Sequence, residues 1–207
     1  DETIKQVSSD GKPLREIILE KGSLPGIKVD QGLIDFKTVN GEKLTQGLEG
    51  LDDRCHEYAS LGAKFTKWRA VINIDEHIPT QDCIDANMNA LAKYASVAQK
   101  NGMVPIVEPE VIMDGSHSIH RCYEVTQESL TSLFSHLSAE GIDIEGTLLK
   151  PNMVISGTTN ENQASVNEVA EKTLKCLIAT LTNELPGIDY FSVGQTDIYS
   201  TAHFDCM

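Results

Sequence analysis

The sequence is short of positive charge and of long apolar runs. Lys and Arg total 17 against 31 Asp and Glu, a formal charge of −14. That balance argues against a nucleic-acid surface, which would need a net basic face. No apolar run reaches membrane-spanning length, and no signal peptide opens the chain, so we expect no membrane contact and a cytoplasmic protein. A few lysines and arginines gathered in a cleft could still bind an anionic substrate.

Paired cysteines and metal-ligand clusters are also absent. The five cysteines are dispersed without a CxxC pair, which predicts reduced thiols that act mostly as small core residues. No cysteine sits beside a histidine in a glycine-framed turn, so a catalytic thiol is not expected. Two histidines share the "HSIH" segment, but a polar loop with no third ligand is a weak metal site. These residues are Cys55, Cys83, Cys122, Cys176 and Cys206, with His117 and His120.

What the chain does contain is an alternation of strands and helices. Its 207 residues, 40% of them apolar, are enough for one large folded domain. Five strands are expected near residues 27, 67, 106, 147 and 190, separated by helices over 48–61, 80–102, 126–141 and 161–185. Residues 1–24 are polar and turn-rich, and 38–45 are expected to form a loop. This pattern is typical of βα units on a parallel sheet, either an α/β barrel or a doubly wound sheet. No glycine-rich phosphate loop follows the first strand, which weakens the second option.

Charged residues collect at the C-terminal ends of four of these strands, where an α/β barrel builds its active site. The last of them, Lys150, ends the apolar segment "IEGTLLK", because Pro151 cannot donate to a sheet ladder. A lysine partly removed from water loses some preference for its charged form, and a neutral amine can attack a carbonyl to form a Schiff base. A lysine that extends from an apolar strand to solvent would give the same pattern, so both interpretations stay open.

Several segments resemble signature stretches of the class I fructose-bisphosphate aldolases, in the same order and over nearly the whole chain. They are "GIKVDQG" (26–32), "TQGLEGLDDRC" (45–55), "AKFTKWRAVI" (63–72), "VPIVEPEVIMDG" (104–115) and "EGTLLKPNMV" (145–154). The resemblance implies a parallel (β/α)8 TIM barrel, of which this chain carries about five strands, the third to the seventh. Residues 1–207 would form a single barrel domain, incomplete at both ends. An aspartate of the first strand and an arginine after the eighth would lie outside it.

The resemblance also implies roles for eight residues. Lys150 would be the Schiff-base nucleophile, Glu108 the acid/base for carbinolamine dehydration, and Lys67 the ammonium group beside the carboxylates Glu108 and Glu110. Two carboxylates this close cannot both ionise freely unless a cation intervenes. Lys28 and Arg69 would hold one phosphate, and the backbone of Ser192 and Gly194 the other, as an anion nest. The structural alternative for these charged residues is a salt-bridged barrel rim.

The implied function is reversible cleavage of fructose 1,6-bisphosphate to dihydroxyacetone phosphate and glyceraldehyde 3-phosphate. No cofactor or metal would be needed, and the resemblance suggests a homotetramer. One position departs from the family pattern: Val193 stands where a glycine is normal before Gly194 and Gln195. If that position requires a positive φ, valine is a poor fit. A catalytically weakened relative, acting as a binding or scaffold protein, is therefore the alternative.

Overall fold

The computed structural model describes residues 2–37, 41–190, 192 and 194–207, except the side chains of residues 2 and 3. Val193, on which the alternative function depends, lies outside the described residues. The helices are α1 (Glu2–Lys5), α2 (Leu14–Glu20), α3 (Leu51–Ser60), α4 (Gln81–Lys100), α5 (Ile119–Ala139), α6 (Val166–Thr180) and α7 (Asp197–Asp205). The strands are β1 (Gly26–Lys28), β2 (Leu33–Asp35), β3 (Lys43–Thr45), β4 (Phe65–Ile72), β5 (Val104–Val111) and β6 (Leu148–Leu149).

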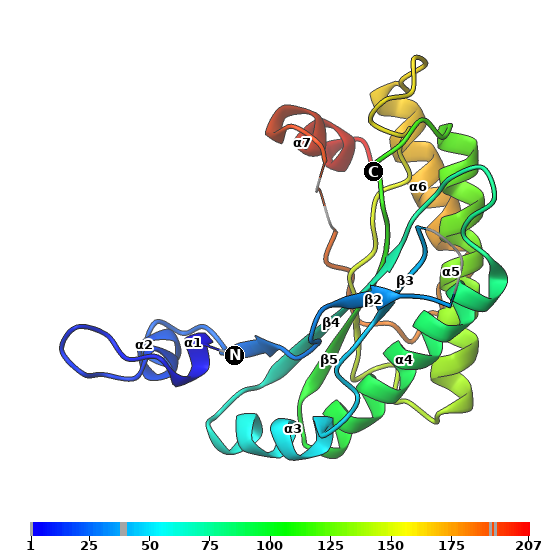
Figure 1. Ribbon diagram of the computed structural model, residues 1–207. Coiled ribbons are helices and arrows are strands. Elements are labelled where there is room, and N and C mark those ends of the chain that lie inside the picture. Colours follow the sequence, from blue (N-terminus) through cyan, green and yellow to red (C-terminus); the bar gives the residue numbers. More distant parts are fainter. Residues whose placement is uncertain (1, 38–40, 191, 193) are drawn as a thin grey trace.

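Four strands form one parallel sheet in the order β1-β4-β5-β6. Each strand of this sheet pairs with the sheet strand that follows it in the chain, and a helix connects the two. Between β1 and β4 the connection contains the β2–β3 hairpin as well as helix α3. The four helices α3 to α6 lie on one side of this sheet in Figure 1. A doubly wound sheet would have helices on both faces, so the arrangement favours the barrel type.

Among the described residues the parallel sheet has four of the five expected strands, and the fifth expected strand, near residue 190, includes residue 191, which lies outside them. At the fifth position, the described residues show a parallel bridge between Leu149 and Ile188, with hydrogen bonds from Leu149 N to Gly187 O (3.3 Å) and from Asp189 N to Leu149 O (2.8 Å). The fourth strand is also shorter than expected. Residues 143–147 are held in turns by hydrogen bonds from Gly146 N to Asp143 O and from Thr147 N to Ile144 O, so β6 begins only at Leu148.

Helix boundaries follow the capping side chains. Thr80 caps α4 as expected, since its hydroxyl accepts a hydrogen bond from Cys83 N. Helix α5 begins well before the expected Thr126, because Ser118 provides the same kind of cap seven residues after β5 ends. Helix α6 spans 166–180 and not 161–185, since Ser165 caps its start.

Three further features were not expected from the sequence. The expected loop over 38–45 is in part a strand, because residues 43–45 form β3 and pair antiparallel with β2, while residues 38–40 lie outside the described residues. Helix α2 lies within the turn-rich N-terminal segment, where α1 and α2 project away from the sheet in Figure 1. Helix α7 follows the last bridge and packs against α6. None of the described helices has the length and apolar character needed to cross a membrane.

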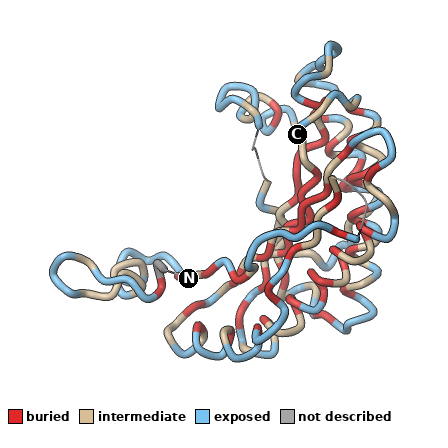
Figure 2. Tube along the Cα trace, in the orientation of Figure 1, coloured by how far each residue is buried: buried red, intermediate tan, exposed pale blue. Residues whose placement is uncertain are grey.

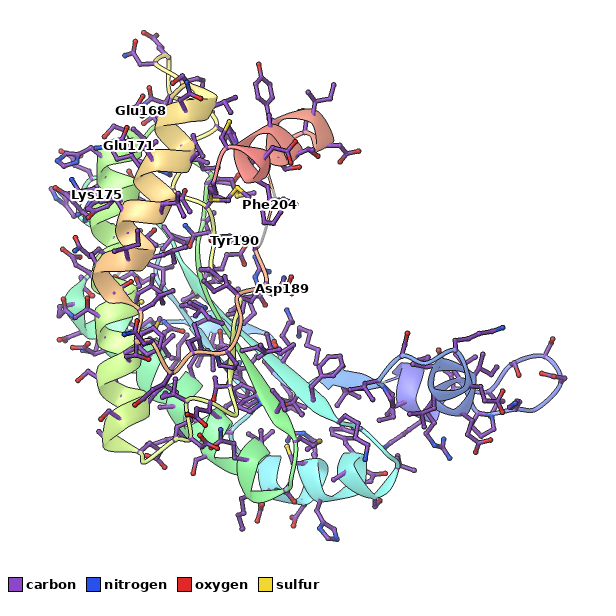
Figure 3. The ribbon with its side chains drawn as sticks, turned by 180° about the vertical axis from the view of Figure 1, so that it is seen from behind. Glu168, Glu171, Lys175, Asp189, Tyr190 and Phe204 are labelled. Atoms are coloured by element: carbon purple, nitrogen blue, oxygen red, sulfur yellow. The ribbon has the colours of Figure 1, made fainter. Side chains whose placement is uncertain are left out.

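The hydrophobic core fills the space between the sheet and its helices, and Figure 2 shows the buried residues along the strands and the inner helix faces. Trp68 of β4 stacks on Tyr94 of α4 with ring centroids 5.5 Å apart. The Tyr94 hydroxyl also lies 2.9 Å from Thr66 Oγ1. Residues 66 and 68 therefore face α4, and alternation along the strand directs Lys67 and Arg69 to the opposite face. The outer surface of α6 is charged, with Glu168, Glu171 and Lys175 exposed (Figure 3).

Candidate active site

The face of the sheet opposite the helices carries Lys150 beside a buried glutamate. Lys150 follows β6, and its backbone N–H donates to Val107 O of β5 at 2.8 Å. Its Nζ donates to Glu108 Oε1 at 2.8 Å, with the lysine side chain 15% exposed and the glutamate fully buried. The lysine thus does not extend freely to solvent, as the snorkelling alternative would require.

The second oxygen of Glu108 is held by Lys67 of the neighbouring strand. Lys67 lies opposite Ile106 in the β4–β5 register, so its ammonium reaches the residue two positions further along β5. Its side chain is 25% exposed. The two ammonium groups, one on each carboxylate oxygen, compensate a negative charge that burial alone would disfavour.

Glu110 has its own cation, Arg69, whose Nε donates to Glu110 Oε2. Burial raises the pKa of Glu110 above its ordinary value, and the Arg69 guanidinium partly opposes that rise. The other oxygen, Oε1, is buried and has no hydrogen-bond partner among the described residues. Glu108 and Glu110 thus pair with different cations, Glu108 with Lys67 and Lys150 and Glu110 with Arg69.

Lys28 and Arg69, expected at a phosphate, are connected through Asp30. Lys28 Nζ donates to Asp30 Oδ1 at 2.6 Å, and the Arg69 backbone N–H donates to Asp30 Oδ2 at 3.3 Å. The Thr45 hydroxyl donates to Arg69 O at 2.7 Å, so the β2–β3 hairpin also supports this strand. The Lys28 side chain remains 51% exposed, which leaves its ammonium accessible from solvent.

Cations gather among the paired residues of this face. The seven residues carry four cations and three carboxylates, a local excess of one positive charge in a chain of net charge −14. A cleft that concentrates positive charge attracts anionic ligands even on an acidic protein. The set comprises Lys28, Lys67, Arg69, Lys150, Asp30, Glu108 and Glu110.

Ser192 and Gly194 follow the Leu149–Ile188 bridge, at the end of the sheet where Lys150 lies. Gly194 has φ +81°, and a Cβ there would lie 2.4 Å from Met113 side-chain atoms, so the position requires glycine. Ser192 is exposed, and its carbonyl accepts a hydrogen bond from Gln195 N (3.2 Å).

Helix α7 supports this turn from the C-terminal side. The side chains of Tyr190 and Phe204 pack edge to face with ring centroids 5.7 Å apart, and Figure 3 shows them together beside α7. Within the same region, Gln195 Oε1 lies 2.5 Å from Nδ1 of the buried His203. The turn that includes Ser192 and Gly194 is thus held between the bridge and α7.

The cysteine and histidine side chains considered in the sequence lie away from this face or have low reactivity. Four cysteines are buried, as predicted, and burial raises the pKa of the Cys55 and Cys83 thiols to about 11 and that of Cys176 to about 12. The side chain of His120 lies near Glu124, while burial lowers the pKa of His117. Across the described part of the chain, no group of three or more His, Cys, Asp or Glu side chains could hold a metal ion.

Six of the eight predicted residues are therefore brought together on one face of the sheet. Sequence reasoning did not select Asp30, which ties Lys28 to Arg69, or Asn152, which hydrogen-bonds to the end of β5. Asp30 lies two residues after Lys28, just beyond the end of β1, and this spacing alone indicated that the two side chains share a face. Asn152 carried no signal beyond its position after Pro151. Fold and site together define a (β/α) barrel segment with a lysine–carboxylate centre at the C-terminal strand ends.

Comparison with known proteins identifies the family. The model of the glycolytic class-I fructose-bisphosphate aldolase family matches residues 1–207. A probable fructose-bisphosphate aldolase class 1 of Xanthomonas axonopodis pv. citri is 55% identical over the whole chain, and the cytosolic fructose-bisphosphate aldolase 5 of Arabidopsis thaliana is 44% identical. The chain belongs to the class I fructose-bisphosphate aldolase family. It spans 62% and 58% of the length of these two relatives.

A solved structure confirms the fold. The fructose-bisphosphate aldolase of Plasmodium falciparum, determined in complex with TRAP and a small-molecule inhibitor, superposes with a TM-score of 0.97 at 40% sequence identity. The match covers 100% of this chain and 60% of that one. The sheet described above is thus part of a TIM barrel, as the resemblance implied.

Proposed function

We propose that the protein is an aldolase that cleaves fructose 1,6-bisphosphate reversibly through a Schiff base on Lys150. The observation that carries the proposal is the buried carboxylate of Glu108, held between the ammonium groups of Lys150 (2.8 Å) and Lys67. A nucleophilic amine beside an acid/base group, with a second cation to balance the charge, is what imine formation needs. Family membership supports the same chemistry.

In the proposed reaction, the Lys150 ammonium passes a proton to the Glu108 carboxylate beside it, and the resulting neutral amine attacks the C2 ketone of the substrate to form a carbinolamine. Glu108 donates a proton to the carbinolamine hydroxyl, which leaves as water, and the iminium forms. Loss of the proton from the 4-hydroxyl then breaks the C3–C4 bond, and the electron pair moves into the iminium to give an enamine. Glyceraldehyde 3-phosphate leaves. Protonation of the enamine at C3 and hydrolysis release dihydroxyacetone phosphate and restore Lys150.

The other site residues would bind and orient the substrate. Lys67 stabilises the carboxylate and the oxyanions that develop beside it. Lys28 and Arg69 bind one phosphate, and backbone N–H groups near Ser192 and Gly194 bind the other. The resemblance assigns the 4-hydroxyl proton to an aspartate of the first barrel strand, which these 207 residues do not contain.

Further properties follow from the same proposal. Residues 1–207 would form part of a single barrel domain, and the full-length protein would be a cytoplasmic homotetramer that needs no metal or cofactor. Two relatives in Arabidopsis thaliana carry the name cytosolic aldolase, which supports the location.

Turnover of fructose 1,6-bisphosphate by the full-length protein tests the function. A coupled assay for either triose phosphate should show cleavage, and Lys150→Met should abolish it, because a thioether cannot form an imine. The matched control is Lys100→Met, which removes a surface lysine paired with Asp52. If fructose 1,6-bisphosphate binds but is not cleaved, the protein is the weakened binding relative and the proposed activity is wrong.

A further inference from the structure

Asn152 is a buried side chain that joins three segments around the candidate active site. Its Oδ1 accepts a hydrogen bond from Val111 N, the last residue of β5, at 3.1 Å. Its Nδ2 donates to Thr126 Oγ1 of α5 at 3.2 Å and to Met153 O at 3.0 Å. The residue is 7% exposed, so water does not readily replace these bonds.

These bonds lie where the parallel ladder between β5 and β6 is weakest. Strand β6 has only two residues, and Lys150 N donates to Val107 O just beyond its end. Pro109 stands two residues after Val107 and has no N–H with which to continue this ladder. The Asn152 side chain supplies the next connection, from Val111 N, in place of a backbone carbonyl.

The two connections bracket the reacting groups. Glu108 follows Val107 and precedes Val111 on β5, and Lys150 lies two residues before Asn152. The distance between Lys150 Nζ and Glu108 Oε1, 2.8 Å, therefore depends on how the two segments are held on either side of it. Lysine has a long flexible stem, so its head group is oriented by the backbone that carries it and by its partners.

We propose that Asn152 is a positioning residue that holds Lys150 against Glu108 for imine formation. The inference rests on the proposed Schiff-base function. When Asn152 is truncated, Val111 N loses its buried acceptor and the segment after β6 shifts or admits water. A displacement of about 1 Å between a nucleophile and its proton donor can slow a reaction on the order of 10²-fold.

The experiment measures the rate of borohydride trapping of dihydroxyacetone phosphate on the full-length protein, together with the melting temperature. Asn152→Ala should slow trapping about tenfold or more, with kcat for cleavage reduced alike and KM nearly unchanged, because the phosphate ligands are other residues. Thr126→Val removes one acceptor of Asn152 and should slow trapping by a smaller factor. The control is Thr173→Val, since the buried Thr173 Oγ1 accepts from Val154 N (3.0 Å) in the same segment, away from β5.

A purely structural role predicts a different pattern. Trapping would then fall equally in the Asn152 and Thr173 variants when their melting temperatures fall equally, and this result would overturn the proposal. If Asn152→Ala does not fold, the Thr126→Val variant provides the test. A trapping rate for Thr126→Val equal to that of Thr173→Val would overturn the positioning role. Failure of the unmodified protein to be trapped at all would instead refute the proposed function, and this inference with it.

Discussion

Removal of Arg69 should destabilise the protein in a way that depends on pH. The Glu110 side chain is 2% exposed, and Arg69 Nε is the cation on its Oε2. Arg69→Met leaves that carboxylate buried without its partner. Breaking a fully buried ion pair costs about 3–5 kcal/mol. Because the Arg69 side chain is 36% exposed, water can reach the gap, and we expect a smaller loss of about 2 kcal/mol at pH 8.

The sign of the pH dependence follows from the raised pKa of Glu110. Burial already raises the pKa of Glu110 above its ordinary value, and loss of the guanidinium would raise it further. The penalty is therefore full above the folded pKa, where the carboxylate is charged, and disappears as the pH falls toward the unfolded value. The free-energy difference between the unmodified protein and Arg69→Met should shrink between pH 8 and pH 5.

Urea unfolding of the full-length protein at several pH values measures this difference. Arg121→Met is the matched control, because Arg121 pairs with Glu124 at 3.3 Å on an exposed helix surface. Its loss should cost about 0–1 kcal/mol at every pH. A penalty for Arg69→Met that is no larger than the control, or that stays constant from pH 8 to pH 5, would refute this electrostatic reasoning.

Three other predictions concern binding, the backbone and metal. Lys28→Met should raise KM for fructose 1,6-bisphosphate about tenfold and change kcat little, since it removes a charge that is 51% exposed and remote from imine formation; an equal loss of kcat in steady-state assays would contradict this role. Gly194→Ala should lower the free energy of unfolding by about 2 kcal/mol or more, because strain at φ +81° adds to a clash with Met113. The control Gly102→Ala, at φ +71° with open space around it, should cost about 1 kcal/mol. Equal urea midpoints for the Gly194→Ala and Gly102→Ala variants would exclude the clash with Met113. Incubation with a chelator should leave turnover unchanged. A loss of turnover that is reversed by added zinc would indicate a metal-dependent enzyme.

Local sequence signals predicted the helices and strands that have their own caps and alternation. The burial of β4 residues alternates from Phe65 to Ala70, and Thr80 marks the start of α4 as its N-cap. The signals failed where tertiary contacts decide. The segment at Ile188 has strand-like residues, yet among the described residues it pairs with Leu149 through a single bridge, because its neighbour β6 is itself only two residues long.

The candidate site was likewise predictable from the sequence only in part. Charged residues at strand ends were visible in the sequence, because alternation and Pro151 place them. The ion pairs between these residues were not visible in the sequence. They depend on the register between β4 and β5, which places Lys67 diagonally opposite Glu108. Asn152 could not be selected at all, because its importance comes from Val111, which is 41 residues away in the chain.

Borohydride trapping tests the central claim most directly, because it reduces an iminium to a stable secondary amine. With dihydroxyacetone phosphate present, the full-length protein should gain one covalent adduct per chain, and peptide mass mapping should place it on Lys150. Lys150→Arg should prevent the adduct, since guanidinium stays protonated and cannot attack. Lys67 should remain unmodified, because the proposal assigns it to charge stabilisation beside Glu108 and not to attack on the ketone. An adduct on Lys67 with Lys150 untouched, or no adduct under conditions of full turnover, would contradict the account.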